Sequence, residues 1–161
     1  MEWIAFLEKG IWLGLAAIGF AILFNVPLRT LKVIFLIGAV GGLVKFLLLK
    51  FGVNITLASL GGSVTVGVMS SYAAHYKHAP PMIFAVPAVI PMVPGVFTYR
   101  MMIGLMELTE DVNAGDYNRI MAETVNNGLK ASFILLALAL GVALPILLTR
   151  KESVKKKRVI S

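Results

Sequence analysis

The residues best suited to binding chemistry lie in a proline-rich segment, 80-PPMIFAVPAVIPMVPGVFTYR-100, which holds five of the seven prolines. Pro87, Pro91 and Pro94 fall at i, i+4 and i+7, so one helix face repeatedly loses backbone N–H donors. Gly95 follows and permits a break. In lipid, such breaks occur where protein or water satisfies the freed carbonyls, and transporters use them to bind solute. The alternative is a kinked helix packed only for shape.

A second set of candidates is a stripe of small and hydroxyl-bearing residues at Ser59, Ser63, Gly67 and Ser71. Their spacing of four places them on one helix face. Small residues let membrane helices approach closely, and hydroxyls form hydrogen bonds to the neighbouring helix. Packing is the favoured interpretation, and a polar lining of a solute path is the alternative. Two further pairs are interpreted as packing positions: Gly10/Gly14 and Gly38/Gly42.

Polar residues at the ends of apolar stretches form a third set. Asn25 ends such a stretch and Pro27 stops its continuation, which favours a helix C-terminus with a turn. As an alternative, the Asn25 amide pairs with a polar solute. Tyr99 and Arg100 follow an uncharged run and act as interfacial anchors, or Arg100 pairs with an anion or a glutamate. The glutamates considered for that pair are Glu107 and Glu123.

Enzymatic chemistry has little support in the sequence. His75 and His78 are the only histidines and there is no cysteine, so neither a thiolate site nor a three-histidine site exists. No serine–histidine–acid set, phosphate-binding loop or dinucleotide fingerprint occurs. We therefore expect no catalytic residue, no metal and no cofactor. The two histidines act as interfacial anchors or handle protons, and an intramembrane enzyme using them is a remote alternative.

The composition requires a membrane environment. The 161 residues are 58% hydrophobic and only 14% charged, whereas soluble domains carry about 25% charged residues. Of the net charge of +7, residues 150–161 contribute +5 (six Lys/Arg and one Glu). The basic excess is therefore a tail that suits anionic lipid headgroups, and we expect no nucleic-acid binding.

Runs without Asp, Glu, Lys or Arg predict four membrane spans, because a bilayer core needs about 20 apolar residues in a helix. The four runs are 10–28, 51–76, 78–99 and 131–149. A fifth span is predicted because Lys32 and Lys45 can snorkel. The predicted fold is all-α, a polytopic membrane bundle of five transmembrane helices with the fourth broken by proline. The helices are expected at about 3–25, 29–49, 54–76, 81–106 and 117–149, with Asp116 capping the last.

The distribution of charge predicts the orientation. Positive residues mark cytoplasmic loops, which places the tail 150–161 inside. Five spans then put the acidic segment 107–127 outside, together with an N-terminus that carries Glu2 and Glu8. Residues 1–149 are expected to form one integral-membrane domain, followed by the cytoplasmic tail.

Two motifs resemble a known family. The segments 24-FNVPLR-29 and 90-IPMVPGVFTYR-100 are similar to the threonine/serine exporter family. The similarity is greater to its small YjjB-like subunits, which match the C-terminal membrane half. It covers roughly residues 5–149, and Met92 replaces the leucine usual in the family. The resemblance implies five functional positions: Asn25, Pro27, Pro91, Pro94 and Gly95.

The resemblance implies half of an exporter of small polar metabolites in the bacterial inner membrane. Fused members are associated with threonine and serine, and split members with succinate and a larger YjjP-like membrane subunit. Five helices are too few to enclose a path alone, so we expect a hetero- or homo-oligomer. A structural or assembly subunit without solute contacts is the alternative. The candidate path residues are Asn25, Pro27, Ser59, Ser63, Pro91, Pro94, Gly95, Tyr99 and Arg100.

Overall fold

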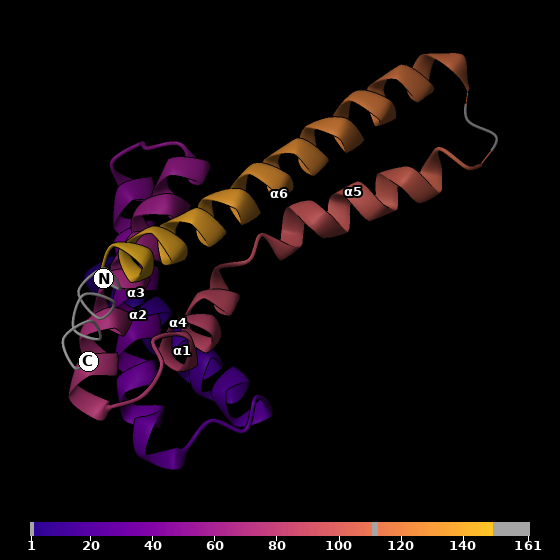
Figure 1. Cartoon of the computed structure of the whole chain (residues 1–161). Helices are drawn as coiled ribbons and strands as arrows, with labels where there is room; N and C mark the ends of the chain where they lie inside the picture. Colours follow the sequence, from indigo (N-terminus) through magenta and orange to yellow (C-terminus); the bar gives the residue numbers. More distant parts are fainter. Residues whose placement is uncertain (1, 111–112, 150–161) are drawn as a thin grey trace. The chain divides into compact units, whose positions relative to one another are not determined.

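The computed structural model describes residues 2–110 and 113–149 (Figure 1). This part of the chain contains helices and no strand, which confirms the all-α prediction. The predicted tail, 150–161, lies outside the described residues. The elements are α1 (Glu2–Leu23), η1 (Leu28–Thr30), α2 (Leu31–Lys50), α3 (Ile55–Lys77), α4 (Met82–Val89), η2 (Ile90–Met92), α5 (Gly95–Glu107) and α6 (Ala114–Thr149).

The helices gather into two compact units. The first, here called the helical core, contains the chain up to Met92 together with α6 from Ala137 onward. The second, here called the hairpin, is Val93–Leu136 and contains α5 and the beginning of α6. The prediction of one domain over 1–149 stays a prediction.

Glycines bring α1 and α2 of the core close together. A Cβ at Gly38 would lie 2.7 Å from the Cβ of Ala17, and one at Gly14 would lie 2.6 Å from the ring of Phe35. Each helix thus presents a glycine to a side chain of the other. The packing interpretation of the small-residue pairs is confirmed, because no larger residue fits at this spacing.

In the core, α2 packs on α1, α3 and α4 (Figure 1), and α3 packs on α2 and α4. Its buried face carries Ser59, Ser63, Gly67 and Ser71. These small polar residues lower the mean hydropathy, and α3 is not among the helices long and apolar enough to cross a membrane. The face of α3 that is buried against other helices does not need a lipid-compatible surface.

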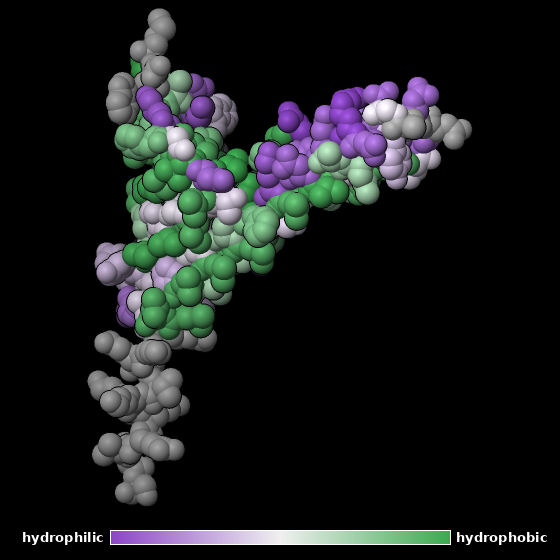
Figure 2. Space-filling view, turned by 90° about the horizontal axis from the view of Figure 1, so that it is seen from above, coloured by the Kyte–Doolittle hydropathy of each residue, from purple (hydrophilic) through white to green (hydrophobic). Residues whose placement is uncertain are grey.

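Within residues 2–110 and 113–149, three helices are long and apolar enough to cross a membrane: Ile4–Leu23, Leu28–Lys50 and Gly115–Thr149. The count rises to four if α4–η2 and α5 together make one broken span. The count of five spans stays a prediction. Large apolar side chains cover much of the outer surface of the core (Figure 2), including Leu23, Leu28 and Phe51, which are 74%, 79% and 76% exposed. A surface of this kind is typical of a protein embedded in lipid.

The hairpin runs out along α5 and returns along α6. α6 begins at Ala114, where the backbone N–H groups of Asp116 and Tyr117 donate to the carbonyl of Asn113. Asp116 therefore lies in the first turn, and its prediction as the capping residue is wrong. The 36 residues of α6 extend about 54 Å, well beyond a bilayer core of about 30 Å. Hydrophilic residues gather toward the loop end of the hairpin (Figure 2).

Candidate solute sites at the proline break and in the hairpin

The proline-rich segment is divided into α4, η2 and α5. Between the last two, Val93, Pro94 and Gly95 form an inverse γ-turn, with Pro94 at φ −80° and ψ 59° and a 2.9 Å hydrogen bond from Gly95 N–H to the Val93 carbonyl. Pro94 is buried and Gly95 is exposed. Pro91, half-buried in η2, also lacks an N–H. Neither Pro91 nor Pro94, three residues apart, can therefore donate a helical backbone hydrogen bond. That this interruption lies within a membrane crossing stays a prediction.

A lysine from another helix occupies the core side of this interruption. Lys45 of α2 donates from Nζ to the carbonyl oxygen of Met92, the last residue of η2, over 2.9 Å. The lysine is half-buried, and a Cβ at Gly62 of α3 would lie 3.0 Å from the lysine Cβ. An ammonium inside an apolar helix is costly unless it meets a charge or a carbonyl. Lys45 therefore holds a backbone carbonyl at the end of η2, next to the break.

The sequence analysis missed this role, because it interpreted Lys45 as a snorkelling residue. The available signal was one positive charge within the apolar run of α2, between Lys32 and Lys50. The sequence could not identify the partner, because the two bonded residues are 47 positions apart.

The serine stripe of α3 faces the C-terminal part of α6. Ser63 Oγ lies 2.9 Å from the carbonyl oxygen of Leu60 and 3.1 Å from that of Ala137. A Cβ at Gly67 would lie 2.9 Å from the carbonyl oxygen of Val142. Ser71 Oγ accepts a 3.2 Å hydrogen bond from Thr149 Oγ1. The packing interpretation is confirmed for these three positions.

Ser59 differs from the rest of the stripe. Its side chain is fully buried, and its hydroxyl has no hydrogen-bond partner in the described part of the chain. Ser59 as a path residue stays a prediction.

Asn25 and Pro27 form the turn that ends α1. Asn25 has φ 55°, its N–H donates to the Ile22 carbonyl, and the Val26 N–H donates to the Ala21 carbonyl. This pair of bonds is a Schellman motif with Asn25 at the left-handed position, so the predicted helix C-terminus is confirmed. Both Asn25 and Pro27 are exposed. A contact of the Asn25 amide with solute stays a prediction.

The histidines lie at the other end of α3. His75 Nδ1 is 2.8 Å from the Ser71 carbonyl oxygen, and His78 ends the helix in the left-handed region at φ 49°. Both line a cavity of about 590 Å³ whose walls are mainly apolar. Within the described residues no three histidine, cysteine or acidic side chains gather into a possible metal site.

In the hairpin, Tyr99 is 66% exposed and Arg100 is also exposed. Arg100 lines a polar cavity of about 270 Å³ between α5 and α6. The cavity is lined by Arg100, Ile103, Gly104, Glu107, Ile120, Glu123, Thr124 and Asn127. Across residues 2–110 and 113–149, neither Arg100 nor Glu107 forms an ion pair, so the bridge considered from Arg100 to a glutamate is not observed.

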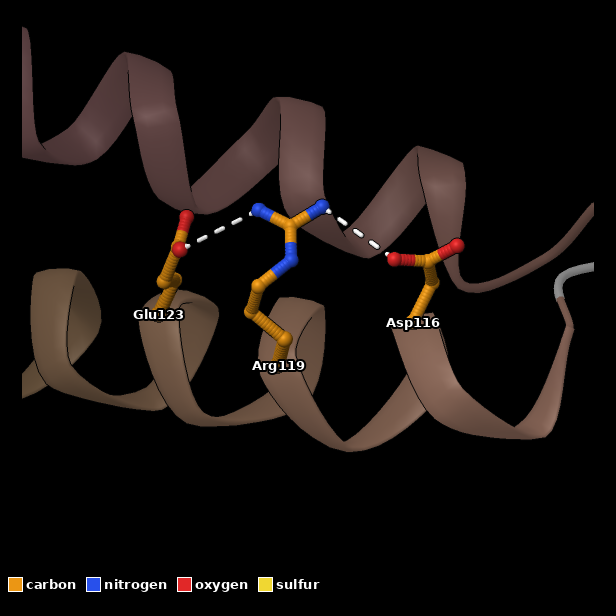
Figure 3. Close-up of polar contacts among 3 residues, drawn as sticks. All are labelled: Asp116, Arg119 and Glu123. Atoms are coloured by element: carbon orange, nitrogen blue, oxygen red, sulfur yellow. Dashed lines mark hydrogen bonds and ion pairs between the residues drawn. The ribbon is translucent and has the colours of Figure 1, made fainter.

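Glu123 is paired with another arginine. Arg119 lies between Asp116 and Glu123 on one face of α6, with N–O distances of 3.5 and 3.4 Å (Figure 3). All three side chains are more than half exposed, so each pair contributes about 0–1 kcal/mol. Of these three residues, Glu123 is the one that lines the cavity.

The nine predicted path residues fall into separate groups. Five belong to the core: Asn25, Pro27, Ser59, Ser63 and Pro91. Four belong to the hairpin: Pro94, Gly95, Tyr99 and Arg100. Arg100 is the one that lines a cavity described above. Lys45, which was not predicted as a path residue, donates a side-chain hydrogen bond to the proline segment.

Comparisons with known proteins match nearly the whole described sequence. Residues 9–148 match the pattern of the family described as Threonine/Serine exporter, ThrE. An uncharacterized protein of Haemophilus influenzae is 33% identical over 139 residues, which are 86% of this chain and 46% of that protein. The chain thus spans about half the length of that relative. No solved structure matches the chain.

The matched region contains both motifs on which the resemblance was based, the α1–α2 turn and the proline segment. It also contains Lys45 and every residue that lines the polar cavity of the hairpin. The prediction of the family is confirmed. The chain belongs to the threonine/serine exporter family, a family of membrane transporters.

Proposed function

We propose that this chain is one half of a secondary exporter of small polar metabolites that carry a carboxylate. The solutes are threonine and serine, or a dicarboxylate such as succinate. Membership of the exporter family supports the transport role. In this proposal the chain works with a second, larger membrane subunit of the same family, as the resemblance to split members implies.

The contact of Lys45 with the Met92 carbonyl is the observation that carries the assignment of a site. A carbonyl is a weaker partner for an ammonium than a carboxylate is, because it bears only a partial charge. A solute carboxylate reaching Lys45 would take over this interaction and release the Met92 carbonyl. Binding of solute would thereby change the bonding of the proline segment, as alternating access requires.

The surrounding assembly follows from the same proposal. The chain lies in the bacterial inner membrane with its N-terminus outside and its C-terminus in the cytoplasm. An odd number of spans joined to a related unit gives an inverted repeat, in which the path forms between the two halves. An ion or solute gradient drives export, with coupling groups from the partner subunit, the histidines or Glu107.

The test is solute efflux from loaded cells that express the chain with its partner subunit. We expect Pro94→Ala and Gly95→Ala to lower efflux strongly, because each restores helical continuity at the turn. Lys45→Met should abolish efflux of carboxylate solutes. Lys9→Met, a change at an exposed lysine of α1, is the matched control. Normal efflux at normal expression in all three site variants would remove the site assignment.

A second candidate function is an assembly subunit without solute contacts. The structural roles of Asn25 in the turn and of Ser63 against α6 favour it. Crosslinking of the chain to its partner, combined with efflux that is insensitive to substitutions at Asn25, Ser63 and Tyr99, would support this function over the first.

A further inference from the structure

α3 and the C-terminal part of α6 border a second cavity in the core, with a volume of about 630 Å³. Its lining residues are Val64, Val68, Ser71, Tyr72, His75, Leu144, Pro145, Leu148 and Thr149. The two helices run in the same direction there, because Ser63 hydrogen-bonds to the Ala137 carbonyl and Ser71 to Thr149. The cavity is therefore a groove along both helices, here called the α3–α6 groove, with its polar end at Ser71, His75 and Thr149.

The α3–α6 groove is as long as one lipid leaflet is deep. Val64 and His75 are eleven residues apart on α3, which corresponds to about 16 Å along the helix. Half of a bilayer core of about 30 Å has nearly the same depth. Leu144 and Leu148 in the wall of the groove are 50% and 69% exposed, so the groove opens on the outer surface of the core.

The polar end of the groove has the residue types of a membrane–water interface. Tyr72 and Tyr76 are 75% and 81% exposed, and the Lys77 ammonium lies 5.4 Å from the centre of the Tyr76 ring. Exposed tyrosines mark the level of the lipid headgroups, and lysine stems extend to the same level. The groove therefore starts at this interface and continues into the hydrocarbon toward Val64.

Polar groups gather where the groove meets the cavity of about 590 Å³. Ser71, His75 and Thr149 line both cavities, and His78 lines the smaller one. The contact of His75 Nδ1 with the Ser71 carbonyl holds the imidazole against its own helix. Two imidazoles and two hydroxyls therefore surround the polar end of the groove.

The charge around this end is entirely positive. Lys77 precedes His78, and the sequence has no Asp or Glu between residues 51 and 106 or between 132 and 149. The residues that directly follow Thr149 in the sequence, 150–161, carry six Lys/Arg and one Glu. An apolar groove with a basic, hydroxyl-bearing end complements a molecule that has a long apolar chain and an anionic head.

We propose that the α3–α6 groove binds an anionic phospholipid. One acyl chain lies along Val64, Val68 and Leu148, and the phosphate meets Lys77 and the Thr149 hydroxyl. A soluble anion would leave the apolar walls uncovered, and a zwitterionic lipid would gain less from the basic end. In the predicted orientation this end faces the cytoplasm, whose leaflet carries the anionic lipids. The lipid contacts α3 and α6 together and joins the ends of the two helices.

The first experiment locates the acyl chain on the wild-type full-length protein in nanodiscs. The probe is phosphatidylglycerol with a photoactivatable diazirine on one acyl chain, and mass spectrometry maps the crosslinked residues. A diazirine near the glycerol should crosslink to Tyr72 and Leu148. A diazirine at the chain end should crosslink to Val64 and Leu144, because these residues lie farther from the polar end.

The second experiment measures affinity by native mass spectrometry of the full-length protein in detergent. The probes are phosphatidylglycerol and phosphatidylcholine with identical acyl chains. We expect phosphatidylglycerol to bind at least about fivefold more tightly, which is the attraction of one basic residue to an anionic lipid surface.

Two variants separate the headgroup from the acyl chain. Lys77→Gln should weaken phosphatidylglycerol about fivefold and leave phosphatidylcholine unchanged, because it removes one positive charge. Val68→Trp should weaken both lipids at least about fivefold, because the indole ring fills the groove and displaces methylene groups from its walls. The matched controls are Lys9→Gln, whose ammonium also lies over an aromatic ring, and Leu57→Trp, at an exposed leucine of α3 outside the groove.

Three results would overturn the lipid site: equal affinity for the two lipids, unchanged affinity for both lipids in Val68→Trp, or crosslinks that avoid the groove. A photoreactive amino acid at position 68 that captures protein instead of lipid in native membranes would also overturn it, because the groove would then be a protein interface. If Val68→Trp does not fold, the crosslinks to the wild-type protein decide. Binding is measured without transport, so the lipid site and the export function are tested separately.

Discussion

The core and the hairpin each hold one basic residue in a candidate site, and they use it differently. Lys45 is enclosed between helices and donates to a backbone carbonyl. Arg100 is exposed, lines a cavity and forms no ion pair with the described residues. The first residue already has a partner in the fold, whereas the second has its donors available to a ligand.

The glycines of the two units show the same contrast. In the core, Gly38 faces the Cβ of Ala17 and Gly67 faces the carbonyl of Val142, atoms that move only with the backbone. In the hairpin, Gly128 faces the Sδ of Met101, the far part of a flexible side chain. We infer that the contacts at Gly38 and Gly67 are rigid, whereas the contact at Gly128 can yield.

The largest change in the free energy of unfolding is expected when Lys45 and Arg100 are each replaced in turn. Lys45→Met leaves the Met92 carbonyl without its donor and should lower the free energy of unfolding by about 1–3 kcal/mol. Arg100→Met should change it by less than about 0.5 kcal/mol, because an exposed side chain is lost. Thermal unfolding in detergent measures both. Equal losses would mean that the two residues have the same structural role.

The next largest change in the free energy of unfolding is expected from substitutions at two glycines. Gly38→Ala should cost about 1–3 kcal/mol, because α1 and α2 must separate to admit a methyl group. Gly128→Ala should be neutral or stabilise by up to about 1 kcal/mol, since Met101 can turn aside and alanine favours the helix. The same unfolding assay compares them. A costly Gly128→Ala would contradict a contact that can yield.

Removing either of two buried hydroxyls should change the free energy of unfolding, in opposite directions. Thr124→Val removes an unpartnered buried hydroxyl and should stabilise the chain by about 1 kcal/mol. Ser63→Ala removes a bond to the Ala137 carbonyl and should destabilise it by about 0.6 kcal/mol, the scale of interhelical bonds in membranes. A destabilising Thr124→Val, measured in the same way, would show that this hydroxyl is bonded within the fold.

The smallest effect is expected in the network of Figure 3. Arg119→Gln breaks two exposed ion pairs spaced i,i+3 and i,i+4 and should cost less than about 1 kcal/mol. The loss should shrink in high salt, which screens exposed charges. Unfolding at two salt concentrations tests this, and a cost that is independent of salt would place the network in a buried environment.

The sequence predicted the features that depend on nearby residues. The all-helical class follows from the apolar runs, and the end of α1 follows from Asn25. The glycine pairs and the serine stripe were identified as packing surfaces because helical spacing places them on one face. These features depend on hydrogen bonds between residues close in the sequence and on the helical spacing of residue types.

The tertiary structure decided which of these surfaces meet. The sequence showed a lysine in an apolar run and a break 47 residues later, but only the packing of α2 on α4 and η2 joins them. It showed Arg100 and Glu123 on separate segments, and the antiparallel packing of α5 and α6 places them around one cavity. Contacts between distant residues depend on how helices pack, and helical periodicity alone does not specify that.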